Sequence, residues 1–191
     1  MNLETQKFEL SKCPFYTALL VSVVLSFMAQ LDANHDIKNL VSLSQSLINE
    51  SKAIRTYEFF LYISFVFTGL AGFAFSKRQV ALNKWFTSPF NYFVTGLLAT
   101  GGVLLGWGYG VLIHAIYFDT TSNITQGIGI ISLFSLYILV PIFIIFFMVA
   151  QVNEIREPIT FKNPIKNKAA FEWVSLGLFS VGAFGVLNMV I

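Results

Sequence analysis

Aspartate and histidine residues that could bind a divalent metal lie near the end of the first apolar stretch of the chain. Asp32, His35 and Asp36 form a DxxHD pattern, and His114 lies inside a later apolar stretch. Imidazole and carboxylate groups together can coordinate a divalent cation. The DxxHD spacing matches no established metal template, however, and polar residues are usual where a membrane helix ends. We therefore predict no metal site and keep these four residues as the candidates for one.

Other chemistries lack the residues that they need. Cys13 is the single cysteine of the chain, so neither an internal disulfide nor a cysteine-rich zinc site is possible. A b-type haem needs two intramembrane histidines on opposing helices, and His35 falls in a connection. The chain has no nucleophile triad, no phosphate-binding glycine loop and no paired carboxylates at a common depth. We predict no catalytic residue and no cofactor.

The composition is that of a membrane protein. Of 191 residues, 55% are hydrophobic and only 12% are charged, which is too little charge to solvate a globular surface. The net charge of +2, without a polybasic run, excludes a nucleic-acid partner.

Five uncharged stretches are long enough to cross a hydrocarbon core, which takes about 20 helical residues. They cover residues 14–31, 59–75, 91–118, 127–150 and 173–191. Because lipid cannot satisfy free peptide groups and these stretches lack strand-like alternation, each is predicted to be a helix. The predicted fold is an all-α integral membrane protein, a single bundle of five transmembrane helices in contact with lipid.

The basic residues predict the orientation of these helices. The chain has 12 Lys and Arg residues, and nine of them lie before the first span or in the second and fourth connections between spans. The first and third connections contain only Lys38, Lys52 and Arg55. Since cytoplasmic connections carry the excess of basic residues, the N-terminus is predicted in the cytoplasm and the C-terminus outside, in a bacterial inner membrane.

One outer connection carries a helical pattern of its own. Apolar residues between 37 and 48 recur on one side of a helical wheel, and Asn34 or Asp36 can cap the first amides. The pattern predicts a short amphipathic helix over residues 36–52. This helix could lie on the bundle, bind a partner protein or lie on the lipid surface.

Small residues recur every four positions and predict close helix contacts, because helices in lipid associate where small residues let their backbones approach. One face carries Ser64, Thr68 and Gly72, and another carries Gly102, Gly106 and Gly110. Similar residues occur in the first and last spans, at Ala18, Ser22, Ser26, Gly177, Gly182 and Gly185. These faces could pack within one chain, against another protein or against a second copy.

Two further residues interrupt the apolar stretches. Pro141 leaves the carbonyl of Tyr137 without its helical partner, so a kink is expected. His114 follows Gly110 by four residues and therefore shares the glycine face, where one hydrogen bond to a neighbouring helix would satisfy it.

Three functions remain open. Contact faces are plentiful and reactive groups are scarce, which favours a non-catalytic protein that binds another membrane protein. In general architecture the chain resembles small accessory subunits of membrane complexes and immunity proteins against pore-forming toxins. The alternatives are a small oligomeric channel or carrier, built through the Gly102, Gly106 and Gly110 face, and an outer-face subunit of a metal- or quinone-linked membrane enzyme.

Overall fold

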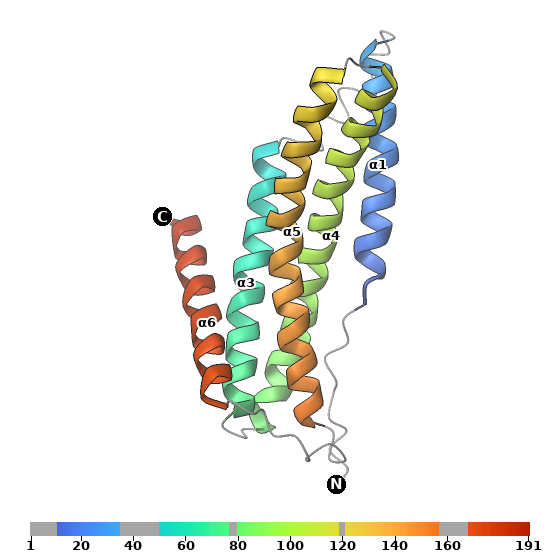
Figure 1. The fold of residues 1–191 in the computed structure, drawn as a ribbon. Coiled ribbons are helices and arrows are strands. Elements are labelled where there is room, and N and C mark those ends of the chain that lie inside the picture. The colour runs from blue at the N-terminus through green and yellow to red at the C-terminus, as the bar shows by residue number, and fades with distance from the viewer. Residues whose placement is uncertain (1–10, 35–49, 77–79, 119–120, 157–167) are drawn as a thin grey trace. The chain divides into compact units, whose positions relative to one another are not determined.

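The computed structural model describes residues 11–34, 50–76, 80–118, 121–156 and 168–191, and all of its regular elements are helices. Figure 1 shows them coloured along the chain. They are α1 (Cys13–Asn34), α3 (Glu50–Ser76), α4 (Val80–Phe118), α5 (Thr121–Arg156) and α6 (Lys168–Val190). Within the described part of the chain there is no strand.

Each of the five helices contains a stretch that is long and apolar enough to cross a membrane. These stretches are Cys13–Leu31, Lys52–Ala74, Ser88–His114, Ile131–Gln151 and Ala169–Val190. Their number agrees with the five spans expected from the sequence. The all-helical fold class is therefore confirmed at this level of length and composition.

The helices run beyond the predicted spans. Helix α4 has 39 residues and begins at Val80, ahead of the predicted start at residue 91, and it contains Pro89. At about 1.5 Å per residue its path is about 58 Å, longer than a hydrocarbon core of about 30 Å. A helix satisfies its own backbone hydrogen bonds, so it can extend beyond the apolar stretch from which the span was predicted.

Most of the predicted amphipathic helix over residues 36–52 lies outside the described residues. Its last three residues belong to α3, which begins at Glu50 and continues without a break to Ser76.

The described residues form two compact units. The first contains residues 58–76, 80–97, 142–156 and 168–191, and the second contains residues 11–34, 50–57, 98–118 and 121–141. The division therefore falls within α3, α4 and α5.

In the first unit, α6 lies beside α3 (Figure 1). Its interior is apolar and includes Leu61, Phe90, Val94, Leu97 and Ile145. Aromatic rings join α3 to α4, where Phe67 stacks on Phe93 with ring centroids 5.4 Å apart and planes 16° apart. Gly96 makes room for the ring of Phe60 in the same contact.

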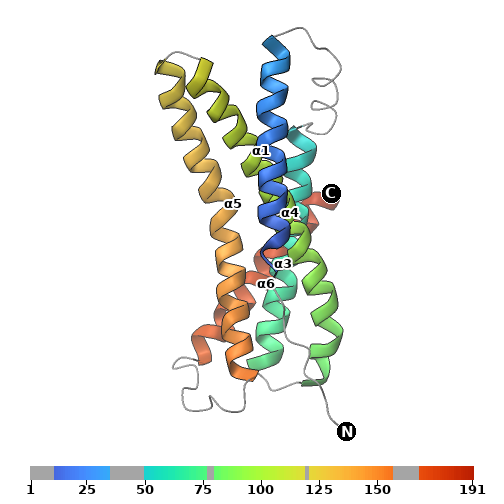
Figure 2. The same cartoon turned by 90° about the vertical axis from the view of Figure 1, so that its right-hand side faces the viewer.

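In the second unit, α1 lies beside α4, as both ribbon views show (Figures 1 and 2). The buried residues here include Leu98, Leu104, Leu105 and Ile138, together with Ser22 and Ser26 of α1. Two buried serines in an apolar setting need hydrogen-bond acceptors, and these acceptors are on α4.

Candidate helix-contact faces

The glycine face of α4 lies against the backbone of α1. A Cβ atom added at Gly102 would lie 2.5 Å from the carbonyl oxygen of Phe15, and one added at Gly110 would lie 2.6 Å from Cβ of Ser26. A Cβ at Gly106 would lie 2.8 Å from Cβ of Ser22. Since carbon atoms pack at about 3.5–4.0 Å, none of these positions has room for a methyl group.

Two serine hydroxyls tie the same helices together. Ser22 Oγ donates a hydrogen bond to the carbonyl of Val103 at 2.7 Å. Ser26 Oγ donates one to the carbonyl of Trp107 at 2.9 Å, and Ser26 is fully buried. Both bonds depend on the glycine spacing, because a short hydroxyl reaches the facing backbone only where the two helices nearly touch. The structure thus brings Gly102, Gly106 and Gly110 together in a contact within one chain.

The small residues of α3 lie in the first unit, where part of the face meets α6. A Cβ at Gly72 would collide with the side chain of Ser175, and Met148 of α5 lies 3.5 Å from the same position. Ser64 and Thr68 are buried, and Thr68 Oγ1 donates to the carbonyl of Ser64 at 2.6 Å. That bond is one helical turn long, so it satisfies Thr68 without linking two helices.

Gly69 is a contact residue that sequence reasoning missed. Its Cβ would lie 2.5 Å from the carbonyl oxygen of Ser175 and 2.6 Å from the amide nitrogen of Phe179. Ser175 itself is fully buried, and its hydroxyl donates to the carbonyl of Phe171 at 2.8 Å. A search for spacings of four misses Gly69, because Gly69 and Gly72 are three residues apart. Residues three apart also share a helix face.

Two of the three glycines of α6 also face α3. A Cβ at Gly182 would lie 2.6 Å from the carbonyl oxygen of Tyr62 and 2.7 Å from the amide nitrogen of Val66. A Cβ at Gly185 would overlap the ring of Tyr62. These glycines allow the second half of α6 to approach α3 closely. Gly69 and Gly72 of α3 do the same for the first half of α6.

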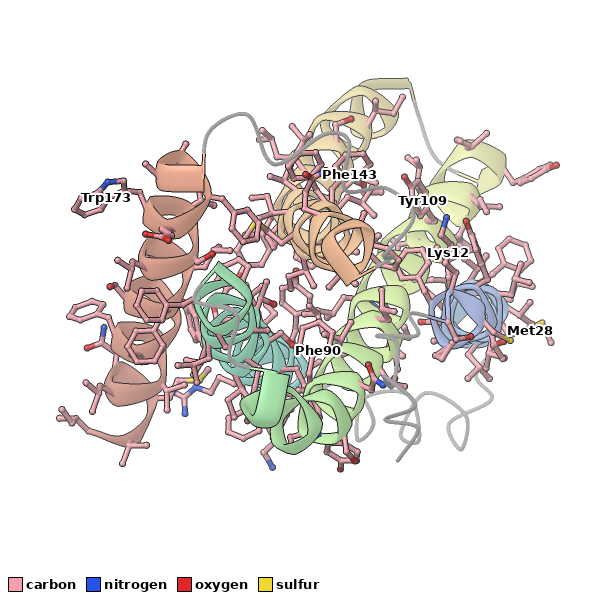
Figure 3. All side chains as sticks on the ribbon, turned by 90° about the horizontal axis from the view of Figure 1, so that it is seen from below. Lys12, Met28, Phe90, Tyr109, Phe143 and Trp173 are labelled. Atoms are coloured by element: carbon pink, nitrogen blue, oxygen red, sulfur yellow. The ribbon has the colours of Figure 1, made fainter. Side chains whose placement is uncertain are left out.

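Gly177, the third glycine of α6, faces open space. In the described part of the chain, no atom lies within 4 Å of the Cβ position there, and Gly129 of α5 is in the same situation. The neighbours of Gly177 on its face are large and exposed: Trp173 is 74% exposed and Phe184 is 67% exposed. Figure 3 shows Trp173 on the side of α6 that points away from α3. We call Trp173, Gly177, Ser180 and Phe184 the α6 notch.

The metal candidates do not form a site in the described residues. His114 is half-buried, and its ring packs edge-on near Phe27 with centroids 6.2 Å apart. Asp32 belongs to α1, but its side chain, like residues His35 and Asp36, lies outside what the structure describes. Among the described side chains, no three His, Cys, Asp or Glu residues are grouped so that they could hold a metal ion.

Tyr57, near the start of α3, is a buried tyrosine. Tyr57 is 0% exposed, and its hydroxyl donates a hydrogen bond to the carbonyl of Ile138 at 3.1 Å. Ile138 precedes Pro141 by three residues in α5. The contact therefore forms at the segment in which the proline was expected to disturb the helix.

Comparisons of this chain with protein-family models, with curated proteins and with solved structures find no match.

Proposed function

We propose that this protein inserts its five helices in a bacterial inner membrane, with its N-terminus in the cytoplasm, and acts by binding another membrane protein. In this proposal it is a non-catalytic accessory subunit or an immunity-type protein. The partner contacts the α6 notch. The main support for this proposal is that the Cβ position of Gly177 faces open space, whereas the other two glycines of α6 are closely packed.

Glycine in the interior of a helix needs a reason, because it is about 1 kcal/mol less favourable than alanine there. Gly182 and Gly185 have one, since a methyl group at either position would strike Tyr62 or Val66. Gly177 has no such reason among the residues that the structure describes. In lipid, small residues mark places where a second helix approaches closely, so an approaching helix supplies the missing reason at Gly177.

The side chains around Gly177 suit such a contact. The intervals along α6 from Trp173 to Gly177, from Gly177 to Ser180 and from Ser180 to Phe184 are four, three and four residues, so these residues share one face. Ser180 Oγ donates to the carbonyl of Leu176 at 2.8 Å, so the notch presents a small side chain whose hydroxyl is already satisfied. The two aromatic side chains, Trp173 and Phe184, flank Gly177 and Ser180 and offer large apolar surfaces to a partner.

The oligomeric channel uses a surface that α1 already covers. Assembly through Gly102, Gly106 and Gly110 would require α1 to leave α4 and would break the hydrogen bonds made by Ser22 and Ser26. We therefore favour partner binding over conduction.

Purification from the native source in mild detergent tests the proposal. A second membrane protein should co-purify with the wild-type chain, and Gly177→Leu should reduce its recovery about tenfold, because leucine fills the notch. Gly129→Leu is the matched control, since Gly129 is also open and the same substitution there leaves α6 unchanged. Recovery of the wild-type chain as a free monomer contradicts the proposal. Equal recovery with both variants would place the partner on a different surface.

A further inference from the structure

Pro141 weakens the hydrogen bonding of α5 at the carbonyls that precede it. It lies inside the helix, so it offers no amide hydrogen to the carbonyl of Tyr137. Its ring also crowds that carbonyl, and helices bend at such positions. The helical segment that ends at Pro141 is therefore held less firmly by its own backbone than the rest of α5.

Tyr57 of α3 contacts this segment directly. Its hydroxyl donates to the carbonyl of Ile138 at 3.1 Å, and both residues are fully buried. The rings of Tyr57 and Tyr137 are neighbours, with centroids 5.8 Å apart and planes 55° apart. Tyr137 in turn stacks near Phe134, with centroids 6.4 Å apart. One hydrogen bond and a short row of aromatic rings thus join the start of α3 to the proline-weakened part of α5.

We infer that Tyr57 and Pro141 form a latch within the second unit. While the Tyr57 hydroxyl is bonded to the Ile138 carbonyl, residues 134–141 of α5 stay against α3. When that bond breaks, the segment is free to move, because Pro141 has removed one of the bonds that would keep it in register. Neither element does this alone: the proline supplies the freedom, and the tyrosine restrains it.

The latch can be tested with spin labels on exposed residues of the same unit. In a Cys13→Ser background, Arg55→Cys and Leu136→Cys place one label on α3 and one on α5. Double electron–electron resonance then gives the distribution of distances between them. Tyr57→Phe should widen this distribution by about twofold, because the segment then samples more than one position.

Two variants serve as controls. Tyr109→Phe removes another phenol that contacts α5, through Ser135 at 3.3 Å, and should leave the distribution unchanged. Pro141→Ala gives residue 141 an amide hydrogen that can bond to the Tyr137 carbonyl, so Tyr57→Phe combined with Pro141→Ala should stay as narrow as the wild type. The inference is overturned if Tyr57→Phe has no effect, if Tyr109→Phe widens the distribution equally, or if the double variant is as broad as Tyr57→Phe.

A second measurement applies if Tyr57→Phe does not fold. Amide hydrogen exchange in the α5 segment before residue 142 is compared between the wild type and Pro141→Ala. A closed latch predicts rates that agree within about threefold, because Tyr57 holds the segment even with the proline present. Exchange more than about tenfold faster in the wild type shows that the tyrosine does not restrain the segment, and overturns the inference.

Discussion

Replacing Gly106 by alanine tests whether the close approach of α1 and α4 stabilises the protein. The new Cβ would strike the carbonyl oxygen of Leu19, and it would lie 2.8 Å from Cβ of Ser22 and 3.1 Å from the amide nitrogen of Val23. To reach an ordinary carbon–carbon separation of about 3.5 Å, α1 must move away by about 0.7 Å. The Ser22 bond to Val103, now 2.7 Å, would then reach the limit of hydrogen bonding.

The expected cost follows from three terms. Overpacking costs about 1–3 kcal/mol, and a weakened interhelical hydrogen bond in a membrane costs about 0.6 kcal/mol. The higher helix propensity of alanine returns up to about 1 kcal/mol. The free energy of unfolding should fall by about 1.5 kcal/mol, which lowers the Tm by about 3–6 °C for a domain of this size.

Gly177→Ala is the matched control for this prediction. The substitution is identical, but the Cβ position at Gly177 meets no atom of the described residues within 4 Å, so only the propensity term remains. Its Tm should therefore stay the same or rise by about 2–4 °C. Thermal unfolding of the purified protein in detergent, followed by circular dichroism, measures both. If Gly106→Ala is as stable as Gly177→Ala, the α1–α4 contact is not what the structure indicates, and the reasoning is refuted.

Further predictions concern α1. Converting Ser22 and Ser26 together to alanine should lower the free energy of unfolding by about 1–2 kcal/mol, because two interhelical hydrogen bonds are lost. Ser180→Ala is the control. The Ser180 bond is made within one helical turn, so this variant should show a smaller loss in the same unfolding assay. Cys13 is exposed and is the single cysteine, so in intact cells it should react with a membrane-permeant maleimide and resist an impermeant one if the N-terminus is cytoplasmic. Labelling by the impermeant reagent would reverse the proposed orientation.

The helices could be predicted from the sequence because their cause is local. Apolar runs of about 20 residues without charge leave the backbone little choice but to bond to itself. The true ends of the helices were harder to predict. Residues 80–90 are polar enough to suggest a connection, yet α4 begins at Val80 and runs through them, and Pro89 does not interrupt it. Apolar composition marks where a helix can be in lipid rather than where it stops.

The contact faces were predictable only as faces. The spacing of Gly102, Gly106 and Gly110 indicates that some helix approaches closely, but it carries no information about which one. The structure supplies α1, and the serines of α1 explain the match, since each hydroxyl meets a carbonyl left accessible by the glycines. Gly177 and Gly182 are both glycines of α6, yet Gly182 packs against α3 and Gly177 faces open space. The residue type alone therefore does not show which glycine contacts another helix.

Tyr57 shows the opposite limit. Tyrosine beside an apolar stretch is usually an interfacial residue, and nothing in its own helix indicates that Tyr57 is buried against another helix. Its burial depends on an acceptor in α5, 81 residues away along the chain. A pattern confined to one helix cannot reveal such a pair.

The bonds between α1 and α4 also constrain how the chain is made. Ser22 and Val103 are separated by 81 residues, as are Ser26 and Trp107. During synthesis α1 is made before α4, so its two serine hydroxyls cannot reach the carbonyls of Val103 and Trp107 until the ribosome has added the glycine-rich half of α4. A nascent chain stalled before residue 98 would present the unmatched α1 to the insertion machinery and to quality-control proteases.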